Sequence, residues 1–155
     1  RRNVLQEKGE TLRFNGYVWD GFAARINSVQ AYYQRSMELL RPEIRSELFC
    51  AQRPVYAKEN DAASTYIDPD GECVNSLISD GCDIQGSVRN CVLFRGVRVE
   101  KGTHVENCIL FKDTVVKAGA SIRCVIADKN VEFGGDVAMA GHAQYPLVVE
   151  KNTKL

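Results

Sequence analysis

Apolar residues recur at a regular interval through the second half of the chain. Four segments align on one another, each with a small residue, two aliphatic residues, a variable pair, a polar residue and a turn residue. They begin at Asn75, Asn90, Asn107 and Arg123, so their starts lie 15, 17 and 16 residues apart. Four segments in register indicate a repeat, because fixed-period self-similarity is typical of stacked architectures.

A second unit separates these segments. In residues 99–105 and 116–122 aliphatic residues stand six positions apart, with a glycine three positions after the first. A period made of three sixes is typical of a parallel β-helix with triangular coils, each with three short strands and three turns. Equivalent inward-facing positions then stack about 4.8 Å apart. The pattern predicts about four or more coils, with Ile84 and Val116 facing the core.

The first part of the chain follows a different pattern. Residues 11–19 are rich in β-branched and aromatic side chains, which predicts a short strand. A helix is expected next, capped by Asn27 or Ser28 and limited at about Arg41 by Pro42. A second short helix over residues 42–49 would carry Pro42 in its first turn. The apolar face of the first helix is formed by Val29, Tyr33, Met37 and Leu40.

These changes of pattern divide the chain into three parts. Residues 1–49 carry the strand and one or two helices, which are too few elements to form a domain alone. Residues 50–73 contain two prolines and a polar stretch, and they are predicted to be an extended linker. Residues 74–155 form the repeat domain. The predicted fold is therefore mainly β, a parallel β-helix preceded by a short strand and one or two helices.

Composition narrows the function classes. The chain has 155 residues, and its 45% apolar and 26% charged content is ordinary for a soluble globular protein. Twenty basic residues balance twenty acidic ones, so the basic surface that nucleic-acid binding needs is not expected. No apolar run approaches the roughly 18 residues of a membrane span, and nothing resembles a signal peptide. We expect a cytoplasmic protein with no nucleic-acid or membrane partner.

The six cysteines are expected to pack as reduced thiols and not to bind metal or carry out redox chemistry. No CxxC pair occurs, so neither a zinc site nor a thioredoxin-type motif is expected, and a cytoplasmic setting keeps thiols reduced. The alignment places Cys91, Cys108 and Cys124 in one column, with Ser76 in the same slot of the first coil. Because buried free cysteine behaves as a small hydrophobe, we predict a tight packing row there.

Only two histidines are present, His104 and His142. The zinc site of a γ-type carbonic anhydrase needs three histidines, so two exclude it unless another residue substitutes. A hexapeptide-repeat acyltransferase needs one histidine as general base, and His104 is the candidate. Its position in a hexad turn is also that of an ordinary solvated residue, which is the favoured interpretation.

An aromatic column completes the candidate chemistry. Phe94 and Phe111 share one column, beside Arg95 and Lys112. Such a stripe would suit a phosphate ligand or a partner, or it would form a ladder covered by the N-terminal helix. The second interpretation is favoured.

Several further segments carry a family resemblance. The end of a nucleotidyltransferase catalytic domain is similar to four segments of this chain, residues 16–18, 25–29, 31–33 and 37–40. The linker that follows that domain is similar to residues 54–56. Residues 75–82, 92–97 and 145–151 are similar to the β-helix and terminus of the same proteins. Together they resemble the C-terminal part of the glucose-1-phosphate adenylyltransferase (ADP-glucose pyrophosphorylase) family. The resemblance implies a left-handed coil, and it makes residues 1–49 the end of a catalytic-like domain.

One departure from the family changes the expected role. Catalytic members carry Asp-Val-Gly-Thr where this chain has Arg25-Ile26-Asn27-Ser28, and that aspartate helps to hold Mg²⁺. An arginine cannot ligate a cation and repels one. The resemblance therefore implies the non-catalytic, regulatory type of subunit, with no catalytic or metal-binding residue in this chain. Asp20, the nearest carboxylate, would replace the aspartate only in a shifted alignment.

The resemblance also implies partners. The family enzyme joins glucose 1-phosphate to ATP with Mg²⁺, releasing pyrophosphate and the ADP-glucose used for glycogen synthesis. This chain would act through assembly and allosteric coupling, in a hetero-tetramer with a catalytic subunit and near a sugar-phosphate effector. The alternatives are an acyltransferase using His104 and a pure oligomerisation module. Basic residues near the domain junction, where an anionic effector would bind, are Arg41, Arg45, Arg53 and Lys58.

Overall fold

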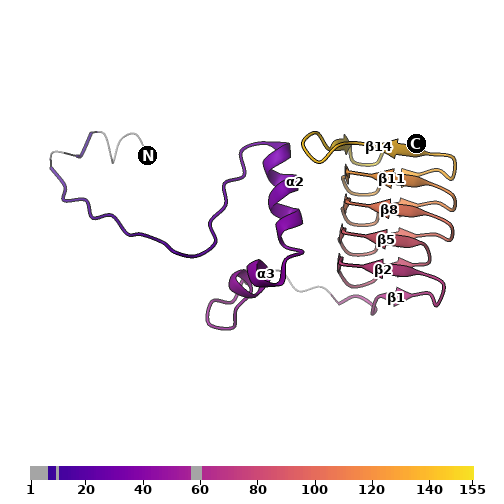
Figure 1. The fold of residues 1–155 in the computed structure, drawn as a ribbon, viewed down its shortest axis with the longest axis horizontal. Coiled ribbons are helices and arrows are strands. Elements are labelled where there is room, and N and C mark those ends of the chain that lie inside the picture. Colours follow the sequence, from indigo (N-terminus) through magenta and orange to yellow (C-terminus); the bar gives the residue numbers. More distant parts are fainter. Residues whose placement is uncertain (1–6, 10, 57–60) are drawn as a thin grey trace.

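Stacked triangular coils form most of the molecule. The structure is a computed structural model that describes residues 7–9, 11–56 and 61–155. The coils lie one above another, helix α2 (Val29–Glu38) runs beside the stack, and the residues before α2 extend away from it (Figure 1). The predicted repeat domain and its two preceding helices are confirmed. The left hand of the coil stays a prediction from the resemblance.

Three parallel five-stranded sheets form the sides of the stack. Sheet A comprises β1 (Tyr66–Ile67), β4 (Asp83–Ile84), β7 (Arg98–Val99), β10 (Val115–Val116) and β13 (Glu132–Phe133). Sheet B comprises β2 (Glu72–Val74), β5 (Ser87–Arg89), β8 (His104–Glu106), β11 (Ser121–Arg123) and β14 (Ala138–Ala140). Sheet C comprises β3 (Leu77–Ile78), β6 (Val92–Leu93), β9 (Ile109–Leu110), β12 (Val125–Ala127) and β15 (Leu147–Val149).

Inward side chains of the three sheets form one continuous core. In sheet A, Val99 pairs with Ile84 on one side and with Val116 on the other. Ile84 and Val116 are fully buried, as their sequence pattern predicts. Full burial of one such side chain contributes about 1.5–3 kcal/mol to folding. Because every coil repeats these positions, the stack accumulates stability coil by coil.

The corners of the coils need backbone conformations that few residues adopt. Asn75, Asn90 and Asn107 occupy equivalent corners with positive φ, which asparagine tolerates better than most residues. The side-chain amide of Asn75 donates to that of Asn90 at 2.8 Å, so the corner asparagines also connect successive coils. Gly102, with φ of 71°, stands in the hexad turn where the sequence places a glycine.

The fourth coil corrects the predicted cysteine column. Ile126 pairs with Ile109, so Val125 lies in the column of Cys91 and Cys108, and the placement of Cys124 there is wrong. Cys124 instead takes the corner position that Asn107 holds one coil earlier, with φ of 51°. The repeat alignment made from the sequence is shifted by one residue in this coil, because three buried residues, Val125–Ala127, follow the corner. The packing row itself is confirmed, since Cys91 and Cys108 are fully buried and adjacent.

Two helices precede the stack. Helix α2 begins after Ser28, whose hydroxyl accepts a hydrogen bond from the Ala31 amide at 3.0 Å. Its C-cap is Leu39, just before the limit set by Pro42. Helix α3 (Pro42–Leu48) has proline in its first turn, as predicted. None of the helices in the described part of the chain is long and apolar enough to cross a membrane.

The strand predicted over residues 11–19 is absent. Tyr17 and Val18 are 84% and 81% exposed, and none of the described strands forms a sheet with this segment. A lone strand leaves its backbone groups without partners, so β-propensity alone does not form one. The linker boundary also moves. Strand β1 begins at Tyr66 and β2 at Glu72, inside the range predicted as linker, because the first coil is exposed and lacks the apolar alternation.

Candidate functional site

Helix α2 packs directly on sheet C, and this contact is the junction between the two parts of the molecule. Tyr33 is 3% exposed and lies against Ile109 of β9 and Ile126 of β12. Its hydroxyl donates a hydrogen bond of 2.7 Å to the backbone carbonyl of Asn107, at a corner of the third coil. The junction therefore combines apolar burial with one directional contact.

The chemistry of Tyr33 suits a fixed structural donor. Burial raises the pKa of its hydroxyl well above the usual value, and the neighbouring Cys124 raises it further. The phenol therefore keeps its proton at neutral pH and remains able to donate to Asn107. Asparagine occupies the equivalent corner in the three preceding coils, and the smaller Cys124 stands beside the Tyr33 hydroxyl in the fourth.

An aromatic ladder extends the junction towards the start of the stack. The Phe94 and Phe111 rings are stacked, with centroids 4.6 Å apart and planes 4° apart. Tyr32 of α2 continues the stack, 6.3 Å from Phe111. The favoured interpretation of this column, a ladder covered by the N-terminal helix, is confirmed. Lys112 beside it pairs with Asp113 at 3.5 Å.

Two hollows flank α2. One, of about 490 Å³, has polar walls that include Gln34, Arg41 and Gln144, and apolar ones that include Met37. The other, of about 600 Å³, lies at the start of the helix and is mostly apolar, with Ile26, Val148 and Phe111 among its walls. Glu38 also lines the first hollow, where its carboxylate pairs with Arg35 at 2.6 Å. Of these two hollows, the first has a cationic wall residue, Arg41, beside neutral hydrogen-bonding groups, so it is the better candidate for a polar anionic ligand.

The structure brings two of the four predicted basic residues together. Arg41 and Arg45 both lie beside Glu43, whose pKa is lowered by a backbone hydrogen bond and then by the Arg41 side chain. Arg45 donates to the carbonyls of Leu39 and Leu40, at 2.9 and 3.2 Å, so it caps the end of α2.

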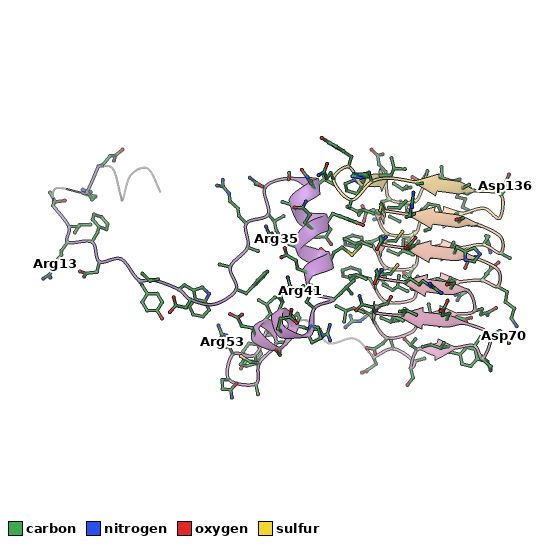
Figure 2. All side chains as sticks on the ribbon, in the orientation of Figure 1. Arg13, Arg35, Arg41, Arg53, Asp70 and Asp136 are labelled. Carbon is green, nitrogen blue, oxygen red and sulfur yellow. The ribbon has the colours of Figure 1, made fainter. Side chains whose placement is uncertain are left out.

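The remaining two basic residues are placed differently. Arg53 donates to the Glu47 carbonyl at 3.3 Å, and its guanidinium lies 5.2 Å from the centroid of the Trp19 ring. Lys58 lies outside the described residues. Arg41 lies where α2 meets α3 and Arg53 lies beside α3, while Arg13 lies far out along the extended segment (Figure 2). Of the described candidates, Arg41 alone lines the polar hollow.

Arg25 is the residue that the resemblance aligns with the metal-binding aspartate of the catalytic family members. Arg25 is exposed on the extended segment before α2, and Asp20 is also exposed. Within the described ranges, no three His, Cys, Asp or Glu side chains gather in a way that would hold a metal ion. Because the Arg25 side chain is cationic, it does not suit a Mg²⁺ ligand position.

The two histidines lie in unrelated places. His104 projects from sheet B and is exposed, and no hydrogen bond orients its ring among the residues described. His142 lies in an irregular loop, where its Nδ1 accepts from the Gln144 amide at 3.2 Å. A general base is held by an orienting partner, which His104 lacks here.

Sequence reasoning missed the polar contacts of the junction. Tyr33 was predicted on the apolar face of α2, but nothing in its spacing indicates that its hydroxyl meets the Asn107 carbonyl. Gln144 lies in a loop outside the repeat, so no periodic signal marks it. Gln34 follows Tyr33 directly, and its position at the flank of the apolar face was the one available hint.

Stacked hexads, glycine and asparagine corners and an external helix define a hexapeptide-repeat solenoid. The family model described as "GlmU-like, C-terminal hexapeptide" matches residues 62–142, and the chain belongs to this family. The match begins at 62, close to β1, which supports the earlier start of the repeat domain.

Individual relatives are more specific. The chain is 43% identical over 150 residues to the glycogen biosynthesis protein GlgD of Bacillus subtilis (strain 168), covering 97% of this chain and 44% of that protein. It is 34% identical over 140 residues to glucose-1-phosphate adenylyltransferase of Acetivibrio thermocellus, covering 88% of this chain and 32% of the relative. The chain is thus GlgD-like and related to the glucose-1-phosphate adenylyltransferases. It spans less than half the length of these relatives.

Proposed function

We propose that this chain is the C-terminal regulatory and assembly region of an ADP-glucose pyrophosphorylase subunit in glycogen biosynthesis. The similarity to GlgD over nearly the whole chain supports this role. The observation that carries it is the junction, where α2 is fixed to the solenoid by Tyr33 and by the aromatic ladder. A segment resembling the end of a catalytic domain is thereby held on the repeat domain, as coupling between the two requires.

The subunit is of the non-catalytic type in this proposal. The resemblance aligns Arg25 with the aspartate that helps to hold Mg²⁺, and a cationic side chain cannot replace it. Mg²⁺ and ATP are then bound by a catalytic partner subunit, in a hetero-tetramer. This chain contributes contacts and the response to an effector, and no chemical step.

A sugar-phosphate effector is proposed for the polar hollow beside α2. Arg41 supplies a cation there, while Gln34 and Gln144 supply the neutral donors and acceptors that hydroxyl groups need. Arg53 and Lys58 are the further candidates for contacting the effector at the domain junction. Arg45 has a structural role at the end of α2, so its substitution would not report on effector binding alone.

The test is ADP-glucose formation by the full-length protein, alone and mixed with a catalytic partner subunit. We expect no turnover alone, and faster or effector-sensitive turnover in the mixture. Replacing Arg41 and Arg53 by glutamine should weaken the effector response at unchanged subunit assembly, while Arg13→Gln, far from the helices, serves as the matched control. Turnover by the protein alone would contradict the non-catalytic assignment.

A further inference from the structure

The loop between β14 and β15 forms one wall of the polar hollow beside α2. It covers residues 141–146 and projects in yellow from the end of the stack towards the helix (Figure 1). Ala143 and Gln144 at its tip line the hollow together with Gln34 of α2 and with Arg41. A movement of this loop therefore changes which groups face a bound molecule.

Both ends of the loop are fixed to the coil before it. The Gly141 amide donates to the Arg123 carbonyl at 2.8 Å, and the Leu147 amide donates to the Cys124 carbonyl at 3.1 Å. A side chain at Gly141 would clash with the Cys124 carbonyl, so only glycine lets the chain pass this close to that corner. Any rearrangement of the loop is thus confined to residues 142–146.

A histidine holds the tip of the loop in its present shape. His142 and Tyr145 form an antiparallel bridge with amide-to-carbonyl distances of 3.2 and 2.8 Å, which closes a turn over Ala143 and Gln144. Inside the turn, the Gln144 amide donates to His142 Nδ1 at 3.2 Å. Among the described residues, this is the one hydrogen bond that the Gln144 amide makes.

Only the neutral imidazole can accept this hydrogen bond. Nδ1 of a neutral ring has a lone pair when the proton is on Nε2, whereas both ring nitrogens of the imidazolium are donors. Protonation therefore sets the Nδ1–H of His142 against the Gln144 N–H, and one of the two donors must turn away. His142 is exposed, so its ring can rotate into water. Histidine changes its charge between about pH 5 and 8, so the change falls in the physiological range.

The charged groups around the loop come from neighbouring elements. Arg123 of β11 lies one coil before the loop. Across the hollow are Arg41 and Glu38 of α2, and the Glu38 carboxylate is already paired within its helix. Tyr145 adds a phenol on the other side of the bridge. His142 forms no ion pair within the described part of the chain, so no carboxylate there holds the charged ring in the turn.

We propose that His142 is a proton-sensitive positioning residue for the polar hollow. The neutral ring keeps the turn closed with Gln144 in the wall, and the protonated ring releases it. Release removes a neutral hydrogen-bonding group while Arg41 stays in place, so the hollow loses recognition of hydroxyl groups but keeps its attraction for an anion. The switch follows from the loop geometry, whereas its effect on a ligand rests on the proposed effector site.

Amide hydrogen exchange of Gln144, measured by NMR on the full 155-residue chain between about pH 8 and 5, tests the switch. Protection relative to the unstructured rate at each pH should fall about fivefold as His142 is protonated, which is the loss of one ordinary hydrogen bond. The ring signals of His142 should shift over the same pH interval.

His142→Asn separates the hydrogen bond from the titration. An asparagine side chain can accept from the amide two residues further on and does not titrate, so Gln144 should stay protected at every pH. His104→Asn is the matched control, because it removes the other histidine of the chain and should leave the pH dependence of Gln144 unchanged. Constant Gln144 protection in the wild-type protein would overturn the proposal, and so would a pH dependence that persists in His142→Asn.

A binding measurement distinguishes the switch from the effector site. With glucose 6-phosphate as the probe, the affinity of wild-type protein relative to His142→Asn should fall about fivefold between about pH 8 and 5.5. Inorganic phosphate, which has no sugar hydroxyl groups, should show no such fall. The two proteins are compared at each pH because phosphate groups titrate in the same range. Equal pH dependence in both proteins would overturn the link between loop and hollow. Absence of glucose 6-phosphate binding at pH 8 would contradict the effector site, and the exchange measurement would still decide the switch.

Discussion

At the scale of single residues, the junction depends on a hydroxyl that no sequence pattern reveals. The helical spacing correctly predicts that Tyr33 faces the core side of α2, because burial follows the period of the helix. The hydrogen bond to Asn107 spans 74 residues of sequence, so local patterns carry no trace of it. The misplacement of Cys124 has a different origin, because a corner position and an inward packing position both accept small residues.

Tyr33→Phe should separate the hydrogen bond from the packing of the ring. The variant keeps the apolar contacts but leaves the Asn107 carbonyl without its donor, so unfolding should become easier by about 1 kcal/mol. Urea denaturation followed by circular dichroism measures the difference. Tyr32→Phe is the matched control, because the Tyr32 ring lies half-buried next to it on the same helix. Equal stability of the two variants would mean that the Tyr33 hydroxyl contributes nothing.

The buried thiol of Cys108 should make the folded protein less stable at alkaline pH. Burial raises the pKa of its thiol well above the ordinary value of 9.0, so the folded state holds the proton more tightly than the unfolded state. The stabilising effect is complete below pH 9 and is lost as the pH rises further, by up to about 1.4 kcal/mol per pH unit. Melting temperatures between pH 8 and 10.5 measure it.

Cys108→Val is the informative variant for this pH effect. Valine already stands in the same column at Val125, so the substitution should cost less than about 1.5 kcal/mol at pH 7. It removes the titrating thiol, and the alkaline loss of stability should become shallower. An unchanged pH dependence would assign the loss to other groups, such as Tyr33.

At the scale of elements, periodicity predicts what repeats and misses what does not. The strands after Asn75 were found because inward aliphatics recur with a fixed spacing and are buried as expected. Strand β1 was missed because Tyr66 and Ile67 are both exposed in the first coil, where no earlier coil covers them. The prediction of a strand over residues 11–19 was wrong for the opposite reason. The composition of this segment suits a strand, but no described strand lies beside it to pair with it.

Val116→Asp tests the assignment of inward positions. A carboxylate there would be fully buried without a partner, which costs several kcal/mol, so the stack should lose its cooperative unfolding transition. Val115→Asp changes the neighbouring residue of the same strand, whose side chain is only partly buried, and should unfold far less. Thermal melting compares the two. A cooperative transition in the Val116 variant would show that this residue does not face the core.

At the scale of the whole molecule, the architecture predicted from the sequence is confirmed, while the effector contacts stay a prediction. Repeats and helices follow from periodic burial, which a single sequence displays directly. The family relation likewise agrees with the similarity to GlgD. The basic residues were predicted from charge and position alone, and the structure gives them different roles, with Arg45 capping α2 and Arg41 lining a hollow. Where a surface side chain points depends on contacts between distant segments, which no local pattern records.

Helix α2 crosses several coils, and this has a consequence for how the molecule opens. A solenoid held only by contacts between adjacent coils can lose its end coils one at a time. Here, Tyr33 of the helix forms one cluster with Ile109 and Ile126, and Phe94 of the preceding coil packs against that cluster. Opening any of these three successive coils alone therefore disturbs the apolar contacts around the helix as well. The helix therefore couples these coils, so the middle of the stack should open as one cooperative unit. A displacement of the helix therefore changes the packing of three coils at once.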